Sequence, residues 1–234
     1  MDIKLLKVPK NVTIIEGFPG FGLVGTIATE YLLEHLKCEF IGKYWFENLP
    51  ATIAIHNGEV VHSIGLFYNK KYNLVIVHSI IPTTNVEWMV AELIDKLAGM
   101  MKAKEIICLE GVGSSGTDDE SKTFYYTTNA VNGKKLAKFS EKLSEGIIIG
   151  GTSALLLRSN KNITALFADT HSKLPDSNAA AKLIELLDKY LGLKIDPKPL
   201  KETAKKFEEK LKGIMEQGSK AQEDMKKKQL SYVG

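Results

Sequence analysis

Short runs of aliphatic and β-branched residues alternate along the chain with longer segments in which hydrophobic residues recur every three or four positions. The run Val12-Thr13-Ile14-Ile15 is typical of a buried strand, and residues 23–37 follow it with helical spacing. The pattern resumes after residue 84, with strand character at 105–110, 123–129, 147–149 and 163–168, and helical character at 85–101, 131–143, 151–158 and 177–191. This alternation predicts a three-layer α/β/α sandwich around a mixed, mainly parallel sheet.

The segment between residues 39 and 80 has a different pattern, because strand-like runs follow one another without a helical segment between them. These runs cover 39–46, 51–56, 59–67 and 72–80. The dipeptide Asn57-Gly58 between two of them is a strong signal for a tight hairpin turn. We therefore expect this part of the chain to form an antiparallel portion at one side of the sheet.

A change of composition marks the C-terminal part of the chain. Asp196-Pro197-Lys198-Pro199 interrupts any helix, because proline lacks the backbone N–H and restricts the residue before it. This boundary predicts an α/β core domain over 1–196 and a helical tail over 197–234. Residues 200–228 are rich in Lys, Glu and Gln and carry only a narrow apolar stripe. Such a helix packs along the domain, pairs with a second copy of itself or projects into solvent.

Composition narrows the functional classes. The 234 residues carry a formal net charge of +3, and Arg158 is the only arginine, which disfavours a nucleic-acid binder. No apolar run approaches the ~20 residues of a membrane span, and the N-terminus lacks the pattern of a signal peptide. Cys38 and Cys108 are isolated in apolar contexts, as reduced thiols are. These features predict a cytoplasmic protein that binds neither nucleic acid nor membrane.

The stretch EGFPGFGLVG, residues 16–25 and called the glycine loop below, connects the first strand to the first helix. Gly20, Gly22 and Gly25 fit the spacing of a dinucleotide-binding loop, which would also need an acid such as Glu47 at the end of a second strand. The loop also carries Phe18 and Phe21, and the following strands are antiparallel. We therefore favour a tight turn that packs on the fold or on another subunit. Its residues, as a subunit or ligand loop, are Phe18, Gly20, Phe21, Gly22 and Gly25.

Other segments offer weaker signals for chemistry. The loop 111–121 combines glycines and hydroxyls that suit an anion with acids at 118–120 that suit a divalent cation, and these two uses oppose each other. Residues 150–153 open a helix, where Thr152 or Ser153 is the expected N-cap. The histidines lack the spacing of metal ligands. The sequence therefore predicts no catalytic residue, no cofactor and no metal site.

Three blocks in a fixed order carry a resemblance to a known family. They are GFPGFGLVG after the first strand, GGTSALLL after a late strand, and LPDSNAAAKLIELLDKYLGLKIDPKPL before the charged tail. Together, over about residues 10 to 215, they resemble the archaeal branch of the proteasome assembly chaperone family. The resemblance implies a fold of the nucleoside-phosphorylase type without catalysis. It further implies a homo-oligomer, either tetramer or pentamer, that binds α subunits of the proteasome core particle.

In that family a C-terminal motif of a hydrophobic residue, a tyrosine and any last residue docks between α subunits. The present chain ends in Leu230-Ser231-Tyr232-Val233-Gly234, so the tyrosine is displaced by one position and Ser231 replaces the hydrophobic residue. Leu230, Tyr232, Val233 and Gly234 are the expected proteasome-binding residues. Two further interpretations stay open: an enzyme acting on a nucleotide or nucleoside, and an oligomeric scaffold whose tails are sequestered.

Overall fold

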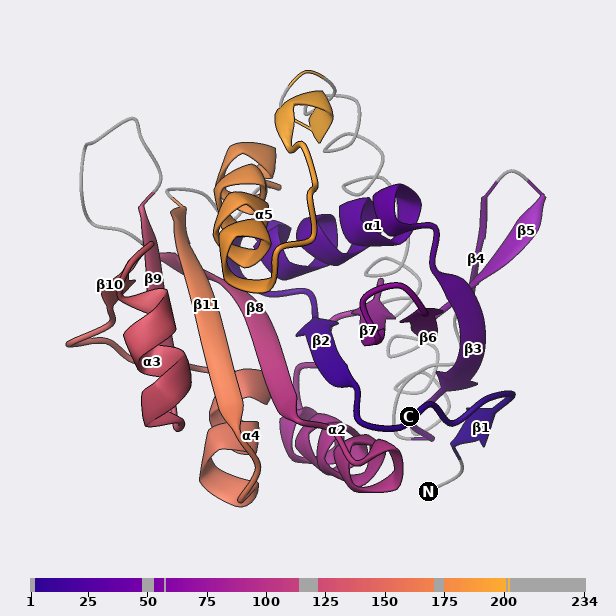
Figure 1. The fold of residues 1–234 in the computed structure, drawn as a ribbon. Coiled ribbons are helices and arrows are strands. Elements are labelled where there is room, and N and C mark those ends of the chain that lie inside the picture. The colour runs from indigo at the N-terminus through magenta and orange to yellow at the C-terminus, as the bar shows by residue number, and fades with distance from the viewer. Residues whose placement is uncertain are drawn as a thin grey trace, which may run out of the picture.

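The computed structural model describes residues 3–47, 53–56, 58–113, 122–170, 175–200 and 202. Within them, nine strands form one sheet in the order β1-β3-β6-β7-β2-β8-β11-β9-β10 (Figure 1). Two further strands, β4 and β5, form a separate hairpin. The strands of the large sheet are β1 Lys4–Leu5, β2 Thr13–Gly17, β3 Glu39–Tyr44, β6 Ile64–Asn69, β7 Leu74–Ser79, β8 Glu105–Gly113, β9 Thr123–Thr127, β10 Glu141–Lys142 and β11 Ile163–Thr170; the hairpin is β4 Ile53–His56 and β5 Glu59–His62.

The centre of the large sheet is parallel and its sides are antiparallel. Strands β7, β2, β8 and β11 run parallel to one another, whereas β6 pairs antiparallel with β7 and β3 pairs antiparallel with β6. At the other side β11 pairs antiparallel with β9, and the short strand β10 pairs parallel with β9. The mixed sheet and its antiparallel portion are thus confirmed.

Helices cover both faces of the sheet, which confirms the three layers. Helices α1 (Val24–Leu36) and α5 (Ser177–Leu191) lie on one face, and α2 (Glu87–Met101) and α4 (Gly151–Arg158) on the other (Figure 1). The short helix α3 (Ala130–Leu136) packs beside β9. A 3-10 turn, η1 (Phe21–Leu23), precedes α1. Each face of the sheet therefore has its own hydrophobic core.

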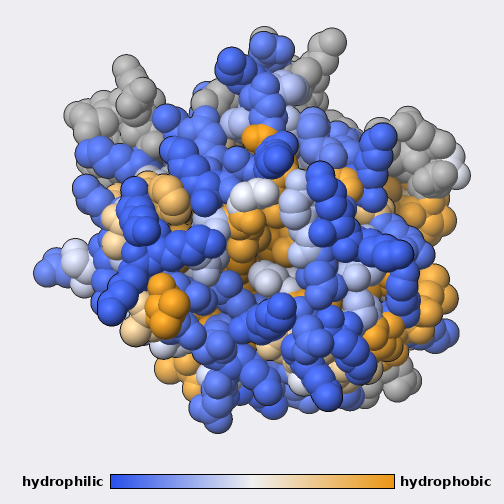
Figure 2. Space-filling model, in the orientation of Figure 1, coloured by the Kyte–Doolittle hydropathy of each residue, from blue (hydrophilic) through white to orange (hydrophobic). Residues whose placement is uncertain are grey.

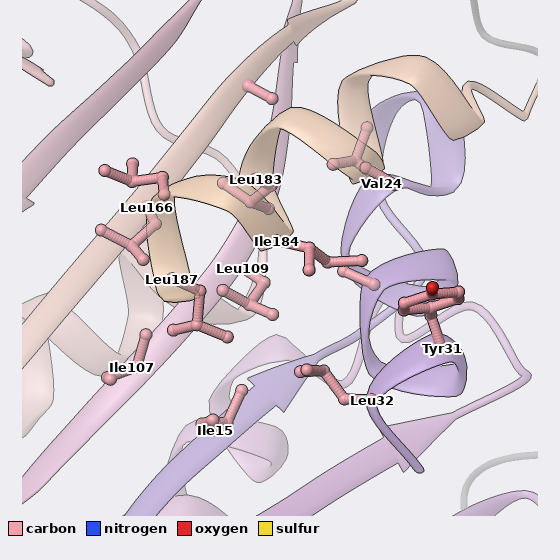
Figure 3. Close-up of a cluster of buried hydrophobic side chains, with 14 of the residues drawn as sticks. Ile15, Val24, Tyr31, Leu32, Ile107, Leu109, Leu166, Leu183, Ile184 and Leu187 are labelled. Carbon is pink, nitrogen blue, oxygen red and sulfur yellow. The ribbon is translucent and has the colours of Figure 1, made fainter. Parts of the chain in front are cut away.

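The core beneath α1 and α5 shows how the sequence pattern directs the packing. Leu183, Ile184 and Leu187 of α5 meet Leu109 and Leu166 of the sheet in Figure 3, and all five are buried. Burying one such aliphatic side chain stabilises the fold by about 1.5–3 kcal/mol. Because side chains alternate along a strand, the strand residues next to these in the sequence lie in the opposite core, under α2 and α4.

Three predicted elements differ from the observed ones. The helix expected over 131–143 ends at Leu136, because the chain tightens into a turn and the Ser140 hydroxyl donates to the carbonyl of Thr123, 2.6 Å away. The run 59–67 divides into β5, which pairs with β4, and β6, which pairs with β3 and β7. Residues 147–149 do not form a strand.

The start of the helix predicted over 85–101 and the cap predicted for the helix over 151–158 are also wrong. Asn85 has a φ of 71° and lies outside α2, whose N-cap is Val86. The N-cap of α4 is Gly150, with a φ of 101° that disfavours any side chain, rather than Thr152 or Ser153. In contrast, α5 spans the predicted residues 177–191, because Asp176 caps its start and Gly192, with a φ of 71°, ends it.

The chain stays attached to the body of the protein up to Leu200. The hydroxyls of Tyr31 and Tyr72 donate to the carbonyls of Asp196 and Leu193, at 2.6 and 2.5 Å, and Leu200 is 1% exposed. The predicted tail beyond residue 202, which includes Leu230, Tyr232, Val233 and Gly234, lies outside the described residues, and the division into 1–196 and 197–234 stays a prediction.

The face of the described body that Figure 2 shows is mostly polar. Hydrophilic side chains dominate the view in Figure 2, and apolar residues show mainly in a hollow near its centre and along its lower and right-hand margins. None of the helices in the described part of the chain combines the length and apolarity needed to cross a membrane.

Candidate functional site

The glycine loop packs closely against the sheet. A Cβ atom added to Gly25 would collide with the carbonyl oxygen of Leu109 in β8, and one added to Gly17 would collide with the carbonyl of Gly25. Gly111 of β8 has the same relation to the carbonyl of Phe21. Three backbone segments therefore approach one another at distances that only glycine permits.

Two other glycines of the loop border side chains. Gly22 has a φ of 62°, and a Cβ atom there would lie 2.9 Å from the hydroxyl of Thr170. A Cβ atom on Gly20 would lie 3.0 Å from Oε2 of Glu110. The group that faces this side of the loop is thus the carboxyl of Glu110. Phe18 is buried in the core under α2 and α4, whereas Phe21 is 39% exposed.

A pocket of about 790 Å³ lies beside the glycine loop, at the carboxyl ends of β8 and β11. Ligands of open α/β sheets bind at this end of the strands, and the volume suits a small molecule. Pro19, Gly20 and Phe21 form one wall and residues 141–150 another. Glu110, Val112, Phe124 and Phe167 line the interior.

Two glutamates meet at the inner end of this pocket. Glu16 is the penultimate residue of β2 and is 2% exposed, and Glu110 lies in the neighbouring β8. The hydroxyl of Thr152, in the first turn of α4, lies 2.6 Å from Oε1 of Glu110 and 3.3 Å from Oε1 of Glu16. Cys108 is aligned with Glu16 in the sheet register and also hydrogen-bonds to it. The two carboxyls are therefore joined through one hydroxyl.

Burial changes the acid–base behaviour of this group. Loss of solvation raises the pKa of Glu16 to about 7, and Thr152, Cys108 and the backbone of Phe18 only partly oppose that rise. Burial and then the charge of Glu16 raise the pKa of Glu110 to about 8. Burial and Glu16 also raise the pKa of the Cys108 thiol, so it is no activated nucleophile. Near neutral pH the two glutamates therefore hold a proton between them.

The outer part of the pocket combines acids and exposed apolar side chains. Glu87, Glu141, Glu145 and Asp169 line it, with Lys142 as the one cation among the described lining residues. Ile147 and Ile149, also in the lining, are 88% and 80% exposed. Large apolar side chains gathered at a pocket mouth are typical of an interaction surface.

The sequence prediction missed this carboxyl pair. Glu16 belongs to the glycine loop but was expected only as part of a turn, and Glu110 was expected only as the end of a strand. Thr152 was expected to cap α4, but its hydroxyl instead donates a hydrogen bond to the glutamate carboxyls. The available signal was Cys108 and Glu110 at alternate positions of one strand, which places them on one face.

Several residues named from the sequence fall outside the description. They are the acids at 118–120 and the four tail residues named above. Among the described residues no group of three His, Cys, Asp or Glu is arranged to hold a metal ion. The glycine loop is the only predicted site that the structure describes in full.

Comparison with known proteins decides the family. A family model described as the PAC2 family matches residues 14–215. The chain belongs to the PAC2 family. An uncharacterized protein of Methanocaldococcus jannaschii is 26% identical over 96% of this chain and 94% of its own.

Solved structures agree with this assignment. Pyrococcus furiosus PbaA, an archaeal homolog of proteasome-assembly chaperone, is similar at 29% identity and a TM-score of 0.82, covering 94% of this chain and all of its own. P. furiosus PbaB, an archaeal proteasome activator, matches at 25% identity and a TM-score of 0.75, covering 91% of this chain and 98% of its own. The resemblance to archaeal proteasome assembly chaperone homologues is confirmed for this PAC2 protein.

Proposed function

We propose that this PAC2 protein is a non-enzymatic assembly chaperone or adaptor that binds α subunits of the proteasome core particle, partly through its C-terminal tail. The observation that carries the proposal is the match to PbaA over almost the whole of both chains. The proposed protein acts in the cytoplasm as a homo-oligomer, as the sequence resemblance implies.

The described surface supports a binding function. Ile147 and Ile149 expose apolar side chains at the pocket mouth, and Phe21 adds a half-exposed ring. Side chains of this kind are stabilised when a partner protein removes them from water, by roughly 25 cal/mol for each Å² of apolar surface buried. Activation of a nucleophile, in contrast, has no support at Cys108, whose pKa is raised by burial.

The tail is tested by truncation. Because Leu200 is buried in the core, the truncation must end after residue 202 rather than before the boundary prolines. We expect the full-length protein to retain recombinant proteasome α subunits in a pull-down and the 1–202 protein to retain them at least about tenfold less well, a loss of ~1.4 kcal/mol. Equal binding by the two proteins would remove the tail from the proposal, and binding by neither would refute it.

A point substitution separates the terminal tyrosine from the bulk of the tail. Tyr232→Ala removes an aromatic ring of the kind that anchors protein interfaces, and Tyr126→Ala removes a ring that is 36% exposed on β9. We expect Tyr232→Ala to weaken retention of α subunits and Tyr126→Ala to leave it unchanged. The opposite ranking would place the contact on the body of the protein.

The enzymatic alternative has its own test. Binding of a nucleotide or nucleoside to the folded state must raise the melting temperature by mass action. We expect no such rise with a panel of nucleotides and nucleosides at millimolar concentration, because the carbonyl of Leu109 fills the space next to Gly25 in the first turn of α1, where a phosphate would have to lie. A clear rise with one of them would support an enzyme instead.

A further inference from the structure

The pocket beside the glycine loop has an unused hydrogen-bond acceptor at its inner end. Glu110 accepts the Thr152 hydroxyl at Oε1, and no described residue donates to its Oε2. That oxygen lies next to the backbone of Gly20, where the missing side chain leaves the space open to the pocket. A carboxylate oxygen facing a cavity is an acceptor that a ligand can complete.

The remaining features of the pocket restrict the charge of such a ligand. Glu87, Glu141, Glu145 and Asp169 line the pocket with Glu110, against the single described cation Lys142. Glu16 lies behind Glu110 and adds a second carboxyl within reach of the same Thr152 hydroxyl. An anion entering this pocket would meet acids on several sides, whereas a cation would be attracted.

The walls restrict the shape of the ligand. Phe21, Phe124, Val112 and Phe167 supply hydrocarbon surface along the pocket, and its volume of about 790 Å³ exceeds what an inorganic ion needs. A flexible chain of methylene groups can pack on these side chains while a terminal group that carries N–H donors reaches Oε2 of Glu110. Lysine and arginine side chains and polyamines have this construction.

The geometry points to a binding site for an alkylammonium or alkylguanidinium group in this pocket, with Glu110 as the charged acceptor at its inner end and Glu16 behind it. The cation comes either from a free polyamine-like molecule or from a lysine or arginine side chain of a protein. This site does not depend on proteasome binding.

Isothermal titration calorimetry of the full-length protein tests the site with agmatine and spermidine as free cations. Acetyl-Gly-Lys-Gly-amide and acetyl-Gly-Arg-Gly-amide represent a protein side chain. Tetramethylammonium is the control ligand, because it has the charge but no N–H donor. We expect agmatine or one of the blocked peptides to bind and tetramethylammonium to bind at least about tenfold more weakly, since charged hydrogen bonds supply the difference.

Two variants locate the contact. Glu110→Gln keeps the shape of the side chain but removes its charge, and we expect it to weaken binding by about tenfold or more. Glu34→Gln removes an exposed carboxyl of α1 that does not line the pocket and should change the affinity by less than about threefold. Thermal melting of both variants checks that each is folded.

The pH dependence adds an independent readout. A cation that binds the ionised form of Glu110 must displace its proton, so the affinity for agmatine should fall by about tenfold from about pH 9 to about pH 7. The guanidinium stays charged throughout that range. Calorimetry in two buffers of different ionisation enthalpy should show a released proton, and this release should disappear in Glu110→Gln.

The results separate the sources of the cation and can overturn the site. Binding of agmatine or spermidine assigns the pocket to a free cation, and binding of only a blocked peptide assigns it to a side chain. No binding of any probe at millimolar concentration, equal binding by Glu110→Gln, or equal binding of tetramethylammonium would overturn the inference. Loss of this site would leave the pull-down with α subunits unaffected, so the two proposals fail separately.

Discussion

Replacing Glu16 by glutamine should remove the part of the pH dependence of the free energy of unfolding that comes from this carboxyl. Glu16 is 2% exposed, and burial raises its pKa from 4.5 to about 7. The folded protein therefore holds a proton on this carboxyl over a pH range in which the unfolded chain has released it. Its stabilising contribution is fully present below about pH 4.5 and is lost as the pH rises through about 7.

The size of the effect follows from the difference between the two pKa values. A change of one pKa unit corresponds to ~1.4 kcal/mol, so the difference between 4.5 and about 7 corresponds to about 3 kcal/mol. Glutamine has nearly the same shape, keeps a carbonyl oxygen for the Thr152 hydroxyl and does not titrate. From about pH 4.5 to about pH 8, the free energy of unfolding of Glu16→Gln should gain about 3 kcal/mol relative to the parent protein.

Urea unfolding at a series of pH values measures this difference directly. Glu145→Gln serves as the control, because this exposed side chain should give a free energy of unfolding that runs parallel to that of the parent protein. The free energy of unfolding of Glu110→Gln should also rise relative to the parent protein as the pH rises, since burial raises the pKa of Glu110 as well. If the free energy of unfolding of Glu16→Gln stayed constant or fell relative to that of the parent protein as the pH rises, the reasoning would be refuted.

Three other substitutions test the packing around the site and the buried carboxyl of Glu105. Gly25→Ala should lower the free energy of unfolding by more than about 3 kcal/mol, because its Cβ would collide with the carbonyl of Leu109. Gly99→Ala, in an open position of α2, should raise it by about 0.5–1 kcal/mol; equal effects of the two would contradict the packing argument. Tyr190→Phe removes the hydroxyl that lies 2.9 and 3.0 Å from the buried carboxyl of Glu105 and should cost about 1–3 kcal/mol in urea unfolding, and a cost near zero would show that this hydrogen bond is replaced by water.

The layers of the fold follow from local sequence, because each element carries its own pattern. Ile14 and Ile15 indicate a strand by their β-branched side chains, and they point to opposite cores in the structure. Helix α5 could be predicted at both ends because Asp176 and Gly192 supply a cap and a left-handed stop. The early end of α3 could not be predicted, because it depends on a hydrogen bond from Ser140 to a strand that lies 17 positions earlier.

The carboxyl pair illustrates what local patterns leave out. Thr152 and Glu16 are 136 positions apart, and their contact requires the register that aligns Glu16 with Cys108. It also requires α4, with Gly150 as its N-cap, to place Thr152 in its first turn beside Glu110 of β8. Long-range pairing of this kind is set by the packing of the whole sheet, so the two glutamates give no joint signal in the sequence.

The glycine loop shows why spacing alone misleads about ligands. A dinucleotide loop needs glycines so that a phosphate can approach the backbone and the start of a helix. Here the space next to Gly25 is filled by the carbonyl of Leu109, and the space next to Gly111 by the carbonyl of Phe21. The remaining opening, at Gly20, faces the carboxyl of Glu110. Glycines at the spacing of a phosphate-binding loop therefore serve here to let the backbone of the loop lie against a neighbouring strand.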